Sequence, residues 1–192
     1  MKSLRRVSGS VLAACIVLVQ LAPAAGAAKV PHGRFGVGDS IMLSASDELA
    51  DFGLDDVNAE VGRQFSAGVP IVRRLAAKGK LPRHVVVHLG TNGPVDPDDC
   101  DDLVGYATGR QIYLVNVRVP RSWEDDVNAT LHACADLYAR VHYLNWWKKS
   151  ARHRRDWIAD DGYHLTAEGQ EVYAAWIDGK VDAVVRSLRT GR

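Results

Sequence analysis

Five residues that could together carry out nucleophilic catalysis are spread along this chain in separate short motifs. They are Ser40, Gly62, Asn92, Asp161 and His164. A histidine that is oriented by a carboxylate can take the proton of a serine hydroxyl, and the serine oxygen can then attack an ester carbonyl. Backbone N–H groups and an amide side chain can stabilise the oxyanion that forms. These residue types therefore predict acyl transfer through a covalent serine intermediate.

Each of these residues also has a purely structural interpretation. Ser40 could be the N-cap of a helix, because serine is a favoured cap residue. Gly62 and Asn92 could simply form turns. Asp161 and His164 could belong to a capping turn before the last helix. No single motif distinguishes a structural role from a catalytic one. The positions of the motifs in the fold and their order along the chain are therefore the relevant evidence.

The elements that position these residues alternate between strand-like and helix-like runs. Strands are predicted at Arg34–Gly38, Asp56–Ala59, His84–Leu89, Gln111–Val117 and Val141–Asn145. Helices are predicted at Ile41–Asp51, Gly68–Lys78, Asp99–Thr108, Trp123–Tyr138 and Ala167–Leu188. This alternation indicates an open, parallel α/β sheet. Ligands of such sheets bind beyond the carboxyl ends of the strands, which is where Ser40, Gly62 and Asn92 fall.

In their order along the chain, the motifs resemble the SGNH (or GDSL) hydrolases. The blocks that carry the resemblance are Gly38-Asp39-Ser40, Gly62, Gly90-Thr91-Asn92 and Asp161-Gly162-Tyr163-His164. The resemblance implies a three-layer α/β/α sandwich around a parallel sheet of about five strands. It implies that Ser40 is the nucleophile, that His164 is the base and that Asp161 orients it. It further implies an oxyanion hole made by the N–H groups of Ser40 and Gly62 and the side chain of Asn92, with no metal and no cofactor.

Three longer stretches look like the extracellular SGNH domain of peptidoglycan O-acetyltransferases: Val61-Gly62-Arg63-Gln64, 88–93 and 116–123. In that subgroup the domain usually follows an integral-membrane domain that supplies the acyl group. The present sequence contains no such part, and this departure favours hydrolysis over transfer. A second departure is Asn145, which stands where the subgroup has aspartate and which we expect to be structural. Met42 stands where the Gly-x-Ser-x-Gly elbow has its second glycine, which argues against an ordinary α/β-hydrolase.

The amino terminus predicts export. A basic segment, 1–6, precedes an apolar run, 11–21, and a small-residue cleavage motif at Ala25-Gly26-Ala27. We therefore expect residues 1–27 to be a signal peptide and 28–192 to be one secreted domain with its core at about 33–189, without stable membrane insertion. The stretch 12–15 also matches a lipobox, so a lipoprotein anchored through Cys15 is the alternative. The apolar run continues past Cys15, and this favours ordinary secretion.

Charge and cysteine usage limit the possible partners. The chain of 192 residues has 24 lysines and arginines against 23 acidic residues, which gives no bulk electrostatic reason to bind nucleic acid. Without the signal peptide the cysteines are Cys100 and Cys134, which could be two buried thiols or a disulfide in an oxidising compartment. Neither has a second Cys or a His at metal-ligand spacing, so a metal site is poorly supported. A monomer is expected.

Two charged stretches could be interpreted as binding sites, one for calcium and one for an anionic polymer, but a structural interpretation of each is favoured. The acidic run 96–102 has Asp101 where a calcium-binding EF-hand loop needs glycine, so a solvated turn entering a helix is the better interpretation. A basic, tryptophan-rich run could favour an anionic wall polymer or glycan, but a solvated helical face with buried tryptophans is preferred. That run contains Trp146, Trp147, Lys148, Lys149, Arg152, Arg154, Arg155 and Trp157.

The sequence therefore predicts a secreted SGNH-type serine esterase. We expect it to cleave small acyl esters, chiefly acetyl esters, on cell-wall or extracellular glycans through an acyl-serine intermediate. One alternative is an O-acyltransferase that passes the acyl group to a glycan hydroxyl. A second is a module of the same fold that binds wall glycan without catalysis, because fold alone does not establish function.

Overall fold

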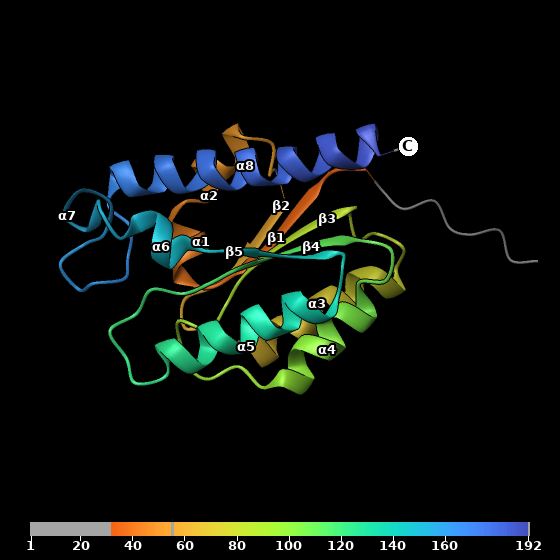
Figure 1. Ribbon diagram of the computed structural model, residues 1–192, viewed down its shortest axis with the longest axis horizontal. Helices are drawn as coiled ribbons and strands as arrows, with labels where there is room; N and C mark the ends of the chain where they lie inside the picture. Colours follow the sequence, from red (N-terminus) through yellow and green to blue (C-terminus); the bar gives the residue numbers. More distant parts are fainter. Residues whose placement is uncertain (1–31, 55, 192) are drawn as a thin grey trace, which may run out of the picture.

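The central sheet has five parallel strands in the order β2-β1-β3-β4-β5 (Figure 1). The strands are β1 (Arg34–Gly38), β2 (Asp56–Ala59), β3 (His84–His88), β4 (Gln111–Val115) and β5 (Val141–Leu144). The computed structural model describes residues 32–54 and 56–191, so the expected signal peptide and Cys15 lie outside the described residues. The prediction of a parallel sheet is confirmed.

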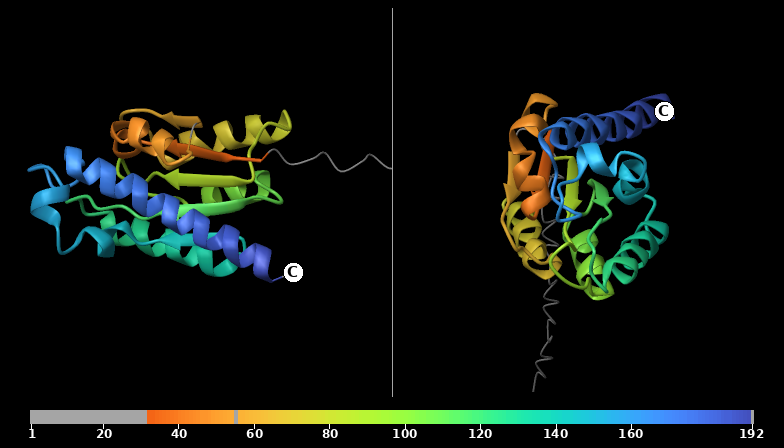
Figure 2. Two further views of the ribbon diagram at one scale, coloured as in Figure 1. Left: turned by 90° about the horizontal axis from the view of Figure 1, so that it is seen from above. Right: turned by 90° about the vertical axis from the view of Figure 1, so that its left-hand side faces the viewer.

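Helices cover both faces of the sheet (Figures 1 and 2). One face carries α3 (Phe65–Ala77), α4 (Pro97–Tyr106) and α5 (Glu124–Leu137). The other carries α1 (Ser40–Ser44), α2 (Ser46–Asp51), α6 (Trp146–Ser150) and α8 (Ala167–Thr190), and α7 (Arg154–Trp157) packs against α8. Side chains of β3 alternate between two apolar clusters, with Val85 and Val87 in one and Val86 in the other. The three-layer arrangement is thereby confirmed.

The last helix is tied to the first strand by ion pairs as well as by apolar packing. Arg34 begins β1, and its guanidinium lies 2.5 Å from a carboxylate oxygen of Asp178 and 2.6 Å from one of Asp182, both on α8. Because these groups are partly buried, solvent screens the pairs less than it screens pairs on the open surface. The two ends of the described chain therefore meet across one face of the sheet.

The structure corrects several predicted boundaries. The predicted helix Ile41–Asp51 is two helices, α1 and α2, separated at Ala45. Three strands were predicted too long, because apolar residues continue into the loops after β3 and β4 and Asn145 caps α6 instead of ending β5. The short helices α6 and α7 were not predicted. Their lengths of five and four residues give too little periodicity to detect.

Cys100 on α4 and Cys134 on α5 form a disulfide in this structure, with an Sγ–Sγ distance of 1.95 Å. Both residues are buried in the helical layer that covers one face of the sheet. The bond joins two neighbouring helices across 34 positions of sequence. It therefore closes a loop that contains β4 and links the helices on either side of that strand.

Reduction of this disulfide is expected to lower the free energy of unfolding by about 3–4 kcal/mol, because an open chain has more conformational freedom when unfolded. Urea unfolding with and without a phosphine reductant measures the change. The variant Cys100→Ala/Cys134→Ala is the control, and its unfolding midpoint should not respond to the reductant. An unchanged wild-type midpoint after both thiols have been released would contradict the prediction.

Mild acid is expected to destabilise the fold through the buried imidazole of His84, which is only 8% exposed. Burial, and the positive charges of Arg34 and Arg83, lower the pKa of His84 from 6.5 to about 4. The unfolded chain therefore takes up this proton first as the pH falls. Neutral His84 therefore makes its full contribution to the free energy of unfolding above about pH 6.5. This contribution, at most about 3 kcal/mol, is lost as the pH falls from about 6.5 to 4.

Urea midpoints at several pH values between 7.5 and 4.5 test this expectation. His84→Gln should flatten part of the slope, whereas replacement of the exposed His132 by glutamine should leave it unchanged. Equal slopes for wild type and His84→Gln would show that other groups cause the acid sensitivity.

Candidate active site

Ser40, His164 and Asp161 form a continuous chain of hydrogen bonds at the carboxyl end of β1. The hydroxyl oxygen of Ser40 lies 3.0 Å from Nε2 of His164. On the other side of the ring, Nδ1 lies 2.6 Å from Oδ2 of Asp161. The other carboxylate oxygen, Oδ1, accepts hydrogen bonds from the backbone N–H groups of Tyr163 (3.1 Å) and His164 (3.0 Å). The structure thus brings together three residues that the sequence analysis singled out.

The turn between β1 and α1 leaves the hydroxyl of Ser40 free for this contact. Asp39, fully buried, is the N-cap, and its Oδ1 accepts the N–H of Ile41 at 3.0 Å. Ser40 is therefore the first residue of the helix, and the alternative in which Ser40 itself caps it is wrong. Gly38 allows the turn, because a Cβ there would lie 2.4 Å from the Cβ of Met42 as the helix folds back on the strand.

A short, internally bonded loop before α8 positions the other two residues. The N–H of Ala159 donates to the carbonyl of His164 at 2.8 Å, and Gly162 donates to the carbonyl of Ala159 at 2.9 Å. Gly162 has a φ of +88°, a conformation that favours glycine. The cap of α8 is Thr166, whose Oγ1 accepts the N–H of Gly169. Asp161 and His164 are therefore not needed as caps and can bond to each other.

The environment of Asp161 keeps its carboxyl group ionised. Partial burial raises the pKa of Asp161, but the hydrogen bonds from the His164 ring and from the N–H groups of Tyr163 and His164 more than offset this. The net pKa therefore lies below its ordinary value. An ionised Asp161 can only accept at Nδ1, which places the proton of a neutral ring there. The lone pair of Nε2 then faces Ser40.

The second and third blocks lie together near the carboxyl end of β1. Gly62 has a φ of +78° in the turn Glu60–Arg63, which is closed by a hydrogen bond from the N–H of Arg63 to the carbonyl of Glu60. The side-chain amide of Asn92 donates to the carbonyl of Arg63 at 3.3 Å. Because an amide nitrogen carries two hydrogens, one remains for a further acceptor. Asn92 therefore lies next to the turn that contains Gly62.

Arg63 connects three of the four blocks, a role that the sequence analysis did not assign. Its guanidinium donates to the carbonyls of Gly38 and Asn58 and forms an ion pair with Glu60 at 3.1 Å. Its own carbonyl accepts the amide of Asn92. The only sequence feature that points to this role of Arg63 is its position beside Gly62, in the stretch 61–64 that looks like the SGNH domain of peptidoglycan O-acetyltransferases.

The site is open. The side chain of His164 is 36% exposed and that of Asp161 is 41% exposed. Five hollows in the described part of the chain have lining residues that do not include Ser40, Asn92 or His164. The imidazole of His164 and the carboxylate of Asp161 are therefore within reach of water.

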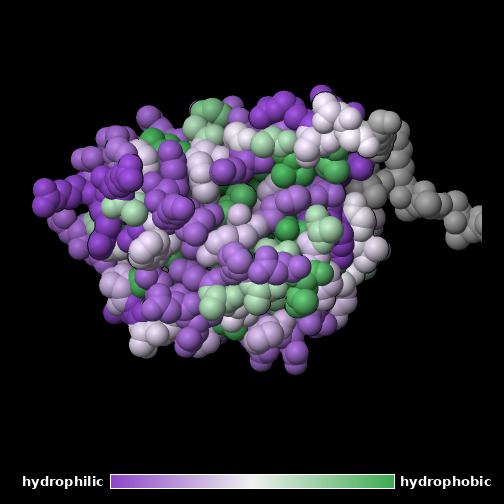
Figure 3. Space-filling view, viewed as in Figure 1, coloured by the Kyte–Doolittle hydropathy of each residue, from purple (hydrophilic) through white to green (hydrophobic). Residues whose placement is uncertain are grey.

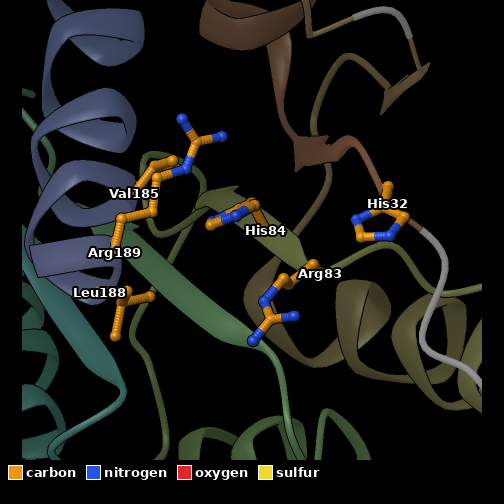
Figure 4. Close-up of a pocket in the computed structure, with 6 residues that line it drawn as sticks. All are labelled: His32, Arg83, His84, Val185, Leu188 and Arg189. Atoms are coloured by element: carbon orange, nitrogen blue, oxygen red, sulfur yellow. The ribbon is translucent and has the colours of Figure 1, made fainter. Parts of the chain in front are cut away.

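A separate hollow of about 240 Å³ lies at the opposite end of the sheet (Figure 4). Its lining comes from the starts of β1 and β3 and from the last turns of α8: His32, Arg83, His84, Val185, Leu188 and Arg189. Because it lies at the amino ends of the strands, it does not form part of the site around Ser40.

Other sequence motifs have structural roles. Asn145 caps α6 by accepting the N–H of Lys148 at 2.8 Å, and its Oδ1 also accepts the amide of Asn116. Asp96 caps α4. Within 32–54 and 56–191, no group of three or more His, Cys, Asp or Glu side chains could hold a metal ion. The helices in this described part include none that is long and apolar enough to span a bilayer.

Comparisons with known proteins agree with this architecture. No protein-family model matches the chain. The peptidoglycan O-acetyltransferase OatA of Listeria monocytogenes is 33% identical over 142 residues, which are 73% of this chain and 22% of that protein. The chain spans less than a quarter of the length of the curated relatives it matches.

Two solved structures show the same fold. The C-terminal catalytic domain of Streptococcus pneumoniae OatA, carrying a methylsulfonyl adduct, has a TM-score of 0.72 at 22% identity over 81% of this chain and 95% of that one. A family 3 carbohydrate esterase of Clostridium thermocellum has a TM-score of 0.64 at 16% identity over 81% and 97%.

Proposed function

We propose that this protein is an enzyme that uses a serine nucleophile to act on acyl esters. The chain has the SGNH hydrolase fold and is homologous to one segment of the peptidoglycan O-acetyltransferases. Its reaction is the cleavage of a small acyl ester, chiefly acetyl, on a cell-wall or extracellular glycan. The observation that supports this most directly is the hydrogen-bonded chain from Ser40 through His164 to Asp161.

The geometry suits a two-step reaction. His164 Nε2 takes the hydroxyl proton of Ser40 as the serine oxygen attacks the ester carbonyl. The oxyanion is stabilised by the N–H groups of Ser40 and Gly62 and by the amide of Asn92. The bond to the leaving alcohol breaks, and the alcohol takes the proton from His164. Water then loses a proton to His164 and attacks the acyl-serine carbonyl; the bond to the serine oxygen breaks, His164 returns the proton to Ser40, and the acid is released.

The partly exposed side chains beside Ser40 suit a small acyl group. A long acyl chain would need an apolar cavity to remove its methylene groups from water, and each one left exposed forfeits about 0.8 kcal/mol. None of five hollows in the described part of the chain includes Ser40 among its lining residues. An acetyl group requires no such cavity.

Transfer to a glycan hydroxyl is the second candidate, and similarity to the O-acetyltransferases favours it. Both reactions share the acyl-serine intermediate and differ only in the acceptor. Product analysis with an acetyl donor, in the presence and absence of a glycan acceptor, separates them. Acetylated glycan above the hydrolytic background assigns transfer, and free acetate alone assigns hydrolysis.

The experiment that tests the proposal is intact-protein mass spectrometry after brief incubation with a panel of short acyl esters. An adduct of one acyl group on Ser40 is expected, with acetyl the most abundant. If no donor in the panel gives an adduct while the protein binds wall glycan, it is a non-catalytic binding module. We further propose that the protein acts outside the cytoplasm, and fractionation of the producing cells tests this.

Replacement of Asn92 by alanine is expected to lower kcat by about 10²–10³ with little change in KM, because the amide acts on the oxyanion and not on the ground-state ester. Turnover of 4-nitrophenyl acetate measures both constants. The exposed Asn58 on β2 provides the control Asn58→Ala, which should behave as wild type. A rise in KM at unchanged kcat would assign Asn92 to substrate binding instead.

A further inference from the structure

A basic hollow of about 390 Å³ adjoins the loop that carries Asp161. It lies between α7 and the start of the loop before α8, and its lining residues are Arg154, Arg155, Ile158, Ala159, Asp160 and Gly162. Gly162 directly follows Asp161, so the hollow borders the catalytic residues. Figure 1 places α7 at the same end of the sheet as α1, and Figure 3 shows that the surface at this end is largely hydrophilic.

The two arginines of the hollow are available to a ligand. Both are exposed, and among the ion pairs of the described residues neither takes part. One carboxylate, Asp160, lines the same hollow and offsets one of the two positive charges. Three further exposed basic residues precede α7 in the chain: Arg152, and Lys148 and Lys149, which line a separate hollow.

The positive region continues into the loop after β4. Arg118 is buried there, donates to Ser150 Oγ at 2.8 Å and stacks on the ring of Trp147, with 4.9 Å between guanidinium carbon and ring centroid. Burial and the positive charge of Arg154 lower the pKa of Arg118, although Glu124 acts in the opposite direction. The indole of Trp147 is 42% exposed beside these charges. An exposed indole next to cationic groups can pack against the apolar face of a sugar ring.

We propose that this hollow binds a negatively charged group, a carboxylate or phosphate, on the same glycan whose ester Ser40 attacks. The planar fork of arginine suits both groups, because each can accept two parallel hydrogen bonds. The hollow borders the catalytic loop, so the anion belongs to a sugar near the acylated one. This inference rests on the proposed function and narrows its substrate class to acylated anionic glycans.

The test compares Arg154→Gln/Arg155→Gln with Lys78→Gln/Lys80→Gln, which removes the same charge at the amino end of the sheet. Three esters are used: acetylated polygalacturonate, neutral acetylated xylan and 4-nitrophenyl acetate. The arginine variant should raise KM for the polygalacturonate ester by about 2- to 30-fold, the range expected for two exposed charge contacts. Its kcat, and its kinetics on the two neutral esters, should match wild type. The lysine variant should match wild type on all three.

Equal loss in both variants would overturn the proposal, since it would assign the effect to net charge. An equal loss on the neutral xylan ester would also overturn it, since the arginines would then not recognise an anion. Added salt should raise KM for the polygalacturonate ester in wild type more than in the arginine variant.

Polymer binding by the Ser40→Ala variant tests the anionic site independently of the proposed reaction. This variant should bind polygalacturonate or poly(glycerol phosphate) more tightly than neutral xylan, and the preferred polymer identifies carboxylate or phosphate as the anion. Adding Arg154→Gln/Arg155→Gln should remove the preference. If wild type lacks esterase activity but this preference holds, the proposed reaction fails and the anionic site stands. Tighter, arginine-dependent binding to phosphatidylglycerol vesicles than to either polymer would overturn the glycan proposal.

Discussion

Replacement of Ser40 by alanine is expected to lower kcat by about 10⁶, because the acyl-enzyme can no longer form. The hydroxyl of Ser40, at one end of the hydrogen-bonded chain, is the group that can become an ester, and its contact with His164 Nε2 at 3.0 Å supplies the base. Residual turnover should come from the oxyanion site alone and should proceed without a covalent adduct.

The measurements are hydrolysis of 4-nitrophenyl acetate and the acyl-enzyme mass. Ser44→Ala is the matched control, since Ser44 lies in the same helix and its hydroxyl bonds only to the carbonyl of Ile41. That variant should keep both turnover and adduct. An acetyl adduct that persists in Ser40→Ala would assign the nucleophile to another residue.

Replacement of Asp161 by asparagine is expected to lower kcat by about 10⁴. The carboxylate accepts from Nδ1 of His164 and from two backbone N–H groups, which together hold its pKa below the ordinary value. An asparagine amide that turns its NH₂ group toward Nδ1 would favour the other tautomer, with the proton on Nε2. The ring would then have no lone pair for the proton of Ser40.

An ordinary Asp–His pair elsewhere in the chain provides the control. His132 and Asp136 on α5 lie 3.0 Å apart on an exposed face, and Asp136→Asn should leave kcat unchanged. Circular dichroism and urea unfolding of Asp161→Asn should show that the loop still folds. Equal activity of Asp161→Asn and wild type would mean that Asp161 does not orient the base.

The parallel sheet and its layers were predictable because local pattern and tertiary burial agree. The bounds of β1 and β2 match the prediction because glycine and polar residues flank them closely. After β3 and β4 the apolar residues continue into loops that are themselves buried, so hydropathy alone placed the strand ends too late. The break at Ala45 leaves no mark in the helical periodicity, since Ala45 and Leu49 are both buried on the same side.

The candidate site was predictable to the extent that its chemistry depends on residue type. A serine after a strand and a histidine three residues after an aspartate are visible in sequence, and the structure brings them together. The roles of Asp39 and Arg63 were not predictable, because they depend on which carbonyl or N–H group lies within reach after folding. An arginine that adjoins one block and bonds to two others has the same sequence context as one in solvent.

The positions of Ser40 and His164, 124 residues apart, also set when the enzyme becomes active. A growing chain acquires the serine turn early in synthesis, but the imidazole arrives just before α8. That helix must then dock beside β1, where Arg34 meets Asp178 and Asp182. If the proposed reaction holds, catalytic competence is therefore among the last properties that a newly made molecule gains, and a chain that stops before His164 carries a serine with no base to activate it.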